Sequence, residues 1–373
     1  MPKKRENILP ELHGSALLEL LNNSGARAIL RQPHVDLGFA EHLPFPFIAL
    51  VGQLEMRFAL VLNLINPQIG GVLLIGPRGV GKTTCVRSLT GIMPDIEVPD
   101  EDILPEELEP DEKIPTHFER VKLIELPLNA RLEDVVGGIN ERIAVQQKRI
   151  VLERGILARA DQNLLYIDEV NLLEKDVVDA ILDAAAQGHY TVRRGAMAGT
   201  FRSRFVLIGS MNPEEGQLRP QIMDRFGLRV IVKGLETIEE RIEVYKRVKQ
   251  YRENPHQFLQ AWAEATAEVR EYVGAARELL KETTIDDDMM EIGIRLVHNL
   301  KIESTRAEFT LFEAARAHAA ADGRDKVELK DLQFVAPLAL RQRRSEFITR
   351  FVEHQRREDD GILHELQSII KKA

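Results

Sequence analysis

The chain has 373 residues, which is enough for two domains and a substantial buried core. Apolar residues make up 44% and charged residues 29%, so the composition excludes collagen-like, disulfide-rich and disordered classes of protein. The 50 Lys and Arg stand against 59 Asp and Glu, and the resulting net charge of −9 excludes a surface that binds nucleic acid or anionic lipid throughout.

The first part of the chain is divided by where short β-rich apolar runs and helical stretches begin to alternate. Residues 1–43 contain no motif and are interpreted as an N-terminal extension. From Pro44 onward, short β-rich apolar runs alternate with helical stretches, a pattern typical of parallel strands joined by crossover helices. The clearest predicted strands are Val72–Ile75, Leu164–Ile167 and Phe205–Gly209. We therefore expect an α/β fold over residues 44–235, with a central parallel sheet flanked by helices.

Two segments inside residues 44–235 carry unusual charge. Residues 95–112 contain ten carboxylates, three prolines and no Lys or Arg, a composition that predicts an exposed loop. Residues 188–205 show the two-residue alternation of side chains that is typical of strands, and they predict a β-hairpin with Gly195 and Gly199 at the turn. The hairpin is basic, but we expect no aromatic platform for base stacking on it and the chain is acidic overall, so nucleic acid is not an expected partner.

After Val232 the β-rich runs nearly vanish and helical patterns dominate. Thr237 and Glu240 have the spacing of a capping box, in which both side chains satisfy free amides at a helix start. We expect a smaller all-helical domain over residues 236–345, with helices near 304–321 and 331–344, followed by a charged helical tail over residues 346–373.

The single cysteine and the hydropathy pattern favour a cytoplasmic protein. Cys85 is alone, so no internal disulfide is expected, and its place one turn into a predicted helix predicts a buried side chain. No apolar run approaches the roughly 18 to 20 residues that span a bilayer, so no membrane association is expected.

The strongest motif follows the first predicted strand. Residues 76–83 fit the pattern G-x-x-x-x-G-K-[ST] of the Walker A phosphate-binding loop. Lys82 would neutralise the β and γ phosphates, Thr83 would bind Mg²⁺, and Thr84 would either hydrogen-bond the α phosphate or cap the helix. The predicted nucleotide-binding residues of this loop are Gly76, Pro77, Arg78, Gly79, Val80, Gly81, Lys82, Thr83 and Thr84.

Polar side chains also end two later strands. Asp168 and Glu169 follow Leu164–Ile167, where Asp168 would hold Mg²⁺ and Glu169 would polarise the water that attacks the γ phosphate. Asn212 follows Phe205–Gly209 and would orient that water. Adjacent carboxylates after a buried strand are otherwise a solvated acidic turn, but the upstream Walker A loop favours the hydrolytic interpretation.

With these motifs, the chain resembles the AAA+ ATPases and, within them, the I subunit of magnesium chelatase. The likeness extends from about Pro44 to Arg344. It is carried by residues 47–53, 126–140, 167–173 and 209–228, and the last of these segments is the most specific. The resemblance implies a P-loop AAA+ core with a C-terminal helical domain, and ATP and Mg²⁺ as cofactors.

The resemblance also implies roles for residues outside the two Walker motifs. Val51, Gly52 and Gln53 would line the adenine pocket. Arg225 matches the arginine finger, which would reach the γ phosphate held by a neighbouring subunit and stabilise charge in the transition state. Arg306 matches the sensor 2 arginine, which would couple the nucleotide to the position of the helical domain. The predicted catalytic residues are therefore Glu169, Lys82, Asn212, Arg225 and Arg306.

Further implications concern partners and activity. Chains of this type form a homo-oligomeric ring, expected here to be a hexamer. They work with a partner subunit bearing a von Willebrand-type domain and with a large porphyrin-binding subunit. ATP turnover would then drive Mg²⁺ insertion into protoporphyrin IX in chlorophyll or bacteriochlorophyll biosynthesis. Two alternatives are a MoxR-like AAA+ chaperone that remodels a von Willebrand-domain partner, and a nucleotide-gated scaffold that does not hydrolyse ATP.

Overall fold

The computed structural model describes residues 43–99, 116–139, 152–194, 197–216 and 218–344. The expected N-terminal extension up to residue 42, most of the acidic segment and the expected tail over 346–373 lie outside these residues.

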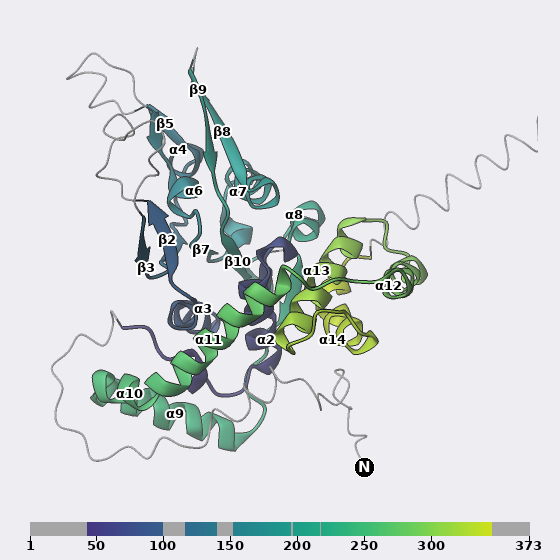
Figure 1. The fold of residues 1–373 in the computed structure, drawn as a ribbon. Helices are drawn as coiled ribbons and strands as arrows, with labels where there is room; N and C mark the ends of the chain where they lie inside the picture. The colour runs from purple at the N-terminus through teal and green to yellow at the C-terminus, as the bar shows by residue number, and fades with distance from the viewer. Residues whose placement is uncertain (1–42, 100–115, 140–151, 195–196, 217, 345–373) are drawn as a thin grey trace, which may run out of the picture.

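Five parallel strands form the central sheet, in the order β11-β1-β10-β7-β4 (Figure 1). This confirms the predicted parallel sheet. Their bounds are β1 Val72–Ile75, β4 Leu123–Leu126, β7 Leu164–Ile167, β10 Val206–Met211 and β11 Leu228–Ile231. The third predicted strand ended at Gly209, but β10 continues through Ser210 and Met211, which are buried like the rest of the strand. Because the strands are parallel, their carboxyl ends share one edge of the sheet, where ligands bind in such folds.

The inner strands β1, β7 and β10 are buried on both faces of the sheet. Val72 and Leu74 pack in the same core as helix α2 (Leu54–Ile65). The intervening Leu73 packs in a second core with helix α7 (Lys175–Gln187). Strands of a parallel sheet that is covered on both faces have continuous apolar sequences, and for this reason these strands could be predicted from the sequence.

Three antiparallel pairs of strands lie outside the central sheet in the described residues. They are β2 (Ile96–Pro99) with β3 (Thr116–Glu119), β5 (Gly137–Ile139) with β6 (Leu152–Arg154), and β8 (His189–Arg194) with β9 (Met197–Arg202). The prediction of a loop from residue 95 was wrong for β2. Ile96 and Val98 alternate with polar residues, and Ile96 is buried, so local pairing outweighs the acidic composition there.

The β8–β9 pair confirms the predicted hairpin but corrects two details. Gly199 pairs with Val192 inside the ladder and is not at the turn. The hairpin does carry aromatic residues: Tyr190 and Phe201 stack with ring centroids 5.5 Å apart. Tyr190 is buried, so it is not an open stacking platform for bases.

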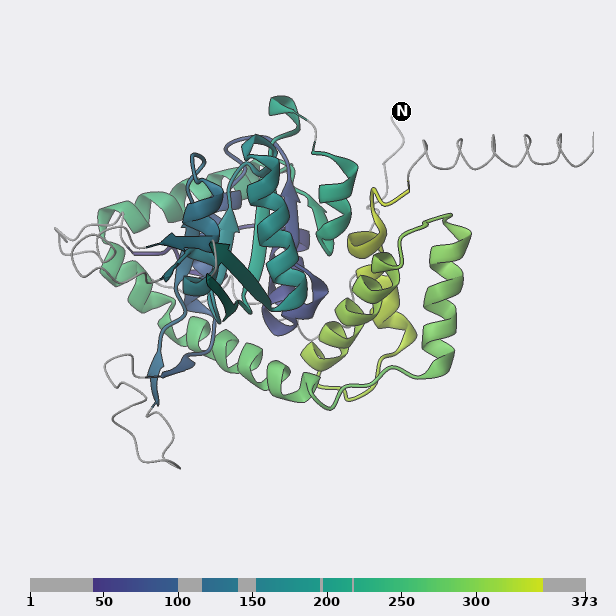
Figure 2. The same cartoon turned by 90° about the horizontal axis from the view of Figure 1, so that it is seen from above.

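Six helices follow β11 in the described residues, the third and fifth of which pack against α2, and all six are drawn in green to yellow in Figure 2. They are α9 Ile238–Glu253, α10 Pro255–Ala261, α11 Ala263–Leu280, α12 Asp287–Asn299, α13 Arg306–Ala321 and α14 Leu329–Leu340. The earlier short helices are α3 Lys82–Ser88, α4 Leu132–Val136, α6 Ile156–Arg159 and α8 Pro220–Arg225. Single 3-10 turns cover Phe47–Ala49, Pro67–Ile69, Leu89–Gly91, Val170–Leu172 and Pro213–Glu215.

The ends of these helices match the sequence signals in part. Thr237 caps α9 and accepts a hydrogen bond from the Glu240 amide, which confirms the predicted capping signal. The last predicted helix was expected to run to Arg344, but α14 ends at Leu340. Arg341 instead takes an extended conformation and its side chain pairs with Glu55 of α2 at 2.5 Å.

A buried ionic cluster ties α13 to α14. Asp331 is fully buried and bonds to His318 Nδ1 at 2.5 Å and to Arg324 Nη1 at 2.8 Å. Burial alone would raise the pKa of Asp331, but the bonds from His318 and Arg324 lower it below its usual value. The folded state therefore favours the ionised carboxylate, and this contribution to stability is lost as the pH falls through the lowered pKa.

Replacement of Asp331 by asparagine is expected to reduce the free energy of unfolding by about 3 kcal/mol, since His318 and Arg324 would lose the fully buried carboxylate that they share. Urea denaturation would measure this change. The wild-type advantage should begin to shrink as the pH falls below about 4, where the carboxylate of the unfolded chain becomes protonated, and it should be lost as the pH falls through the lowered pKa of the folded state. Asp325→Asn is the matched control because Asp325 is exposed. Equal unfolding midpoints for Asp331→Asn and the wild type at neutral pH would contradict this account.

Candidate nucleotide-binding site

The loop between β1 and α3 has the backbone that the Walker A pattern predicts. Gly79 and Gly81 have φ of 78° and 88°, in the left-handed region that favours glycine. At Gly76 a Cβ atom would lie 2.2 Å from the Val232 carbonyl oxygen, so no larger residue fits there. The loop is therefore shaped by its glycines, as phosphate-binding loops require.

Lys82 is buried, and its amine lies inside this loop. Its Nζ donates hydrogen bonds to the carbonyl oxygens of Gly76 at 2.5 Å and Pro77 at 2.8 Å. Burial lowers the pKa of Lys82, and the nearby Asp168 and Glu169 carboxylates partly offset this effect. The amine is thus held by neutral carbonyls, which a phosphate group can displace with a stronger charge-assisted bond. The neighbouring Cys85 is buried as expected, and burial raises the pKa of its thiol to about 12.

A cavity of about 340 Å³ joins this loop to the carboxyl ends of β7 and β10. We call it the smaller cavity. It brings together the two Walker motifs and the predicted Asn212, as the sequence predicted. Its lining consists of Arg78, Gly79, Val80, Gly81, Lys82, Thr83, Thr84, Asp168, Glu169, Ser210, Met211 and Asn212.

Glu169 is paired with an arginine of the Walker A loop. Arg78 Nη2 lies 3.1 Å from Glu169 Oε1 and 2.5 Å from Glu215 Oε1. Asn212 donates a hydrogen bond to the same Glu215 oxygen at 3.2 Å. The Arg78 side chain is 72% exposed, so each of these pairs contributes at most about 1 kcal/mol and is easily exchanged for a ligand. Sequence reasoning missed this contact, because 91 residues separate Arg78 from Glu169.

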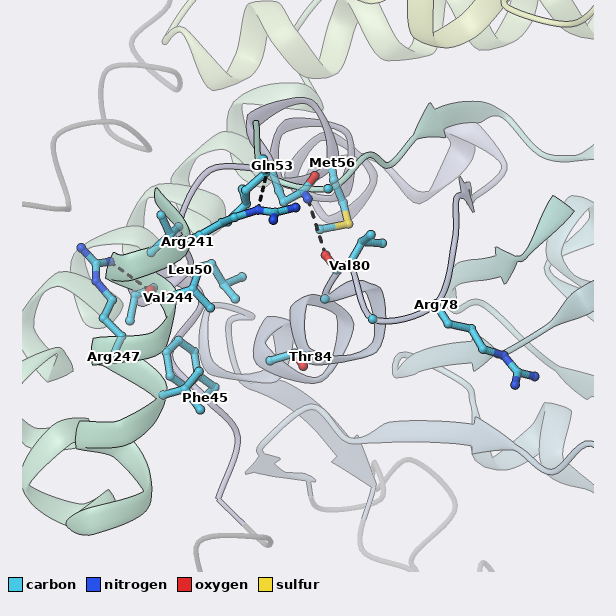
Figure 3. A pocket seen from close by; sticks show the side chains of 17 residues that line it. Phe45, Leu50, Gln53, Met56, Arg78, Val80, Thr84, Arg241, Val244 and Arg247 are labelled. Atoms are coloured by element: carbon cyan, nitrogen blue, oxygen red, sulfur yellow. Dashed lines mark hydrogen bonds between the residues drawn. The ribbon is translucent and has the colours of Figure 1, made fainter. Parts of the chain in front are cut away.

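A larger cavity of about 600 Å³ continues from the other side of the loop (Figure 3). Its walls are mostly apolar, with Phe45, Leu50, Met56, Val80, Val244 and Val248 among them. Val51 and Gln53 line it as predicted, and Gln53 Nε2 donates to the Lys233 carbonyl oxygen at 2.6 Å. Gly52 lies just outside the lining, where a Cβ atom would meet Leu235 at 2.6 Å.

Helix α9 supplies a wall of the larger cavity that the sequence did not reveal. Arg241 and Arg247 come from this helix, and in Figure 3 both lie beside the cavity. Arg247 Nη1 donates to the Ala49 carbonyl oxygen at 2.9 Å, which fixes α9 against the segment that precedes α2. Arg78, Gly79, Val80, Gly81 and Thr84 line both cavities, so the two are continuous along the loop.

The comparisons with known proteins agree with this geometry. Residues 140–237 match an MCM P-loop domain and residues 294–366 match an AAA lid domain. The chain is 42% identical over 317 residues to the magnesium-chelatase subunit ChlI homolog of Methanocaldococcus jannaschii, which covers 81% of this chain and 87% of that protein. The chain belongs to the ChlI family of magnesium-chelatase subunits.

Other relatives support the same family and fold. The magnesium-chelatase 38 kDa subunit of Chlorobaculum tepidum is 38% identical over 316 residues, with 81% of each chain covered. A crystal structure of a putative ATPase from Cytophaga hutchinsonii, 22% identical, has a TM-score of 0.54 and covers 79% of this chain and 83% of that one. That likeness shows the fold alone.

In this member of the ChlI family, the two predicted arginines lie away from both cavities. Arg225 ends α8 and pairs with Asp179 at 3.2 Å and Asp183 at 3.0 Å. Arg306 begins α13 and is exposed. Neither lines the larger or the smaller cavity within the described residues. The structure therefore brings neither arginine to the predicted nucleotide site of its own chain.

Asp224, next to Arg225, is held within its own chain. Its carboxylate accepts hydrogen bonds from Ser304 Oγ at 2.7 Å and from Arg343 Nη1 at 2.7 Å. The bond from Ser304 links α8 to the residues just before α13, and Figure 1 shows these two helices near each other. Among the described residues, none of the helices has the length and apolar character needed to cross a membrane.

Proposed function

We propose that this chain is the ATP-hydrolysing I subunit of a magnesium chelatase. The observation that carries the proposal is the continuous pair of cavities along the Walker A loop, with Asp168 and Glu169 at one end, in a chain of the ChlI family. ATP turnover at this site would power Mg²⁺ insertion into protoporphyrin IX. The relatives are named as subunits, which supports a role as one component of a larger enzyme.

The two cavities suit the two ends of ATP. The larger cavity is apolar and would hold the adenine, with Val51 and Gln53 in its wall. The smaller cavity carries the loop amides and Lys82, which would bind the phosphates. Thr83 and Asp168 offer the hydroxyl and carboxylate oxygens that Mg²⁺ prefers, so the residues fit this ion. Mg²⁺ bound with ATP supplies charge neutralisation on the phosphate oxygens.

Hydrolysis requires Glu169 to act on a water molecule. In the structure its carboxylate is paired with Arg78. A phosphate that attracts Arg78 and Lys82 would release Glu169, which could then accept a proton from the attacking water. Asn212 lines the same cavity, and its side-chain amide donates to Glu215 in the structure. Once that bond breaks, the Asn212 amide can hydrogen-bond the attacking water. Binding of nucleotide and activation of the base are thereby coupled through the loop.

The site is completed by a neighbour in this proposal. Arg225 and Arg306 line neither cavity of their own chain, which fits residues that act on the site of a neighbouring subunit. We infer a homo-oligomeric ring, with six subunits expected, that works in the cytoplasm. Its partners would be a subunit with a von Willebrand-type domain and a large porphyrin-binding subunit.

Reconstitution tests the proposal. The purified chain, mixed with the porphyrin-binding and von Willebrand-type subunits, ATP, Mg²⁺ and protoporphyrin IX, is expected to produce Mg-protoporphyrin, which fluorescence would follow. Replacing the chain by its Lys82→Ala variant should remove the signal, because the phosphates lose their main counter-charge. Steady ATP hydrolysis by the wild-type mixture without any Mg-protoporphyrin would contradict the chelatase assignment and leave an ATPase of other purpose.

A further inference from the structure

Two buried hydroxyl groups lie behind the predicted Mg²⁺ ligands. Tyr166 is in β7, is 1% exposed, and its hydroxyl lies 2.9 Å from Asp168 Oδ1 and 3.3 Å from Thr83 Oγ1. Ser210 is in β10, is also 1% exposed, and its hydroxyl bonds to the same Asp168 oxygen. Ser210 Oγ additionally accepts a hydrogen bond from the Glu169 amide at 3.1 Å. Two neighbouring strands thus hold the Walker B carboxylate from one side.

The direction of each hydrogen bond follows from the groups involved. An ionised carboxylate can only accept, and each hydroxyl has one hydrogen to give. Tyr166 and Ser210 therefore both donate to Asp168 Oδ1. With its hydrogen used there, the Tyr166 oxygen can only accept from Thr83. Thr83 consequently donates away from the cavity and keeps its lone pairs for a cation.

The same reasoning leaves one carboxylate oxygen for the metal. Asp168 Oδ1 accepts both hydroxyl bonds, while Oδ2 has no hydrogen-bond partner among the described residues. Asp168 and Thr83 both line the smaller cavity. Both predicted ligands therefore line the same cavity and keep lone pairs that no protein group among the described residues occupies.

We propose that Tyr166 and Ser210 are positioning residues that orient Thr83 and Asp168 for the Mg²⁺ of Mg-ATP. This inference rests on the proposed ATP site. Groups that hydrogen-bond to metal ligands fix their orientation, and their removal typically weakens metal affinity by about 10- to 100-fold. Ser210 lines the smaller cavity, but within the part of the chain that the structure describes the hydrogen bonds of both side chains go to Asp168, Thr83 Oγ1 and the Glu169 amide, and none goes to Lys82 or a loop amide. Nucleotide affinity without Mg²⁺ should therefore depend little on them.

Equilibrium binding separates an effect on Mg²⁺ affinity from an effect on nucleotide affinity without Mg²⁺. A fluorescent, non-hydrolysable ATP analogue would be titrated into the full chain in EDTA and at a series of Mg²⁺ concentrations. Tyr166→Phe and Ser210→Ala are each expected to raise the Mg²⁺ concentration that gives half of the affinity gain by about tenfold or more. The affinity in EDTA should stay within about twofold of the wild type, because the loop glycines and Lys82, which would bind the phosphates, are unchanged.

Tyr272→Phe is the matched control. The Tyr272 hydroxyl is a donor to the Ala321 carbonyl oxygen in the helical part of the chain, so this variant also loses a partly buried phenol bond. It is expected to leave the Mg²⁺ dependence unchanged. Wild-type Mg²⁺ dependence in both Tyr166→Phe and Ser210→Ala would overturn the inference, even with the ATP site intact. Absence of any analogue binding by the wild type would instead refute the proposed function.

Should one variant bind no analogue even in EDTA, its loss is structural and the other variant decides. The two residues lie on different strands and contact Asp168 independently, so one failure of folding does not predict the other. A shift in the Mg²⁺ requirement for the surviving variant supports the inference, and an unshifted requirement contradicts it.

Discussion

Replacement of Glu169 by glutamine is expected to reduce ATP hydrolysis by about 10²- to 10⁴-fold while ATP still binds. Glutamine keeps the size of the side chain but cannot take a proton from the attacking water. The Walker A loop, Lys82 and Asp168 are untouched, so the nucleotide keeps its binding groups. Release of inorganic phosphate measures the first effect, and equilibrium binding of labelled ATP measures the second.

Glu174→Gln is a suitable control for this experiment. Glu174 precedes α7, is exposed, and lies outside the lining of the smaller cavity. Its replacement removes one carboxylate five positions from Glu169 without altering the site. Hydrolysis by Glu169→Gln within about threefold of the Glu174→Gln rate would show that another group acts as the base.

Arg225→Ala is expected to lower ATP hydrolysis by about 10³-fold, because a guanidinium that stabilises the transferring phosphate contributes about that much. The Arg225→Ala chain should still fold. The ion pairs of Arg225 with Asp179 and Asp183 are partly exposed, and each stabilises the chain by about 1 kcal/mol at most. ATP affinity should therefore remain near the wild-type value in a binding assay.

Arg295→Ala controls for the loss of a surface arginine. Arg295 pairs with Glu291 on α12 at 2.5 Å and is 74% exposed, so it resembles Arg225 in its partner but not in its proposed role. Its ATPase rate is expected to match the wild type. If Arg225→Ala and Arg295→Ala hydrolyse ATP equally well, Arg225 is not the arginine finger.

The parts of the site that could be predicted from the sequence are the motifs formed by consecutive residues. Each of these motifs directly follows a buried strand: residues 76–83 follow β1, and Asp168 and Glu169 follow β7. The motif and the strand could therefore be identified together. Parallel pairing of β1, β10 and β7 then brings the strand ends to one edge. Local pattern and topology suffice there because each functional group lies within a few residues of a strand end.

The parts that sequence did not predict depend on contacts between distant segments. Arg241 and Arg247 reach the larger cavity only because α9 packs beside the Walker A loop. The bonds from Tyr166 and Ser210 to Asp168 depend on the register between β7 and β10. In sequence, Tyr166 is one more apolar strand residue and Ser210 one small polar residue, so neither pattern indicates that its hydroxyl faces a carboxylate.

The β2 strand shows the opposite error. The acidic composition of residues 95–112 predicted a loop, but composition averages over the segment and conceals the alternation at its start. Ile96 and Val98 pair across to Glu119 and His117 of β3, and both join the main apolar core. A short run with period two carries more information about the backbone than the net charge around it.

The most direct test of a site shared between two subunits is to mix two inactive variants. Glu169→Gln chains keep Arg225, and Arg225→Ala chains keep Glu169, so an interface between them can hold one complete site. When equal amounts are mixed before assembly with ATP and Mg²⁺, hydrolysis is expected to recover to about one quarter of the wild-type rate, the share of interfaces with the productive order. A mixture as inactive as either variant alone would contradict the account.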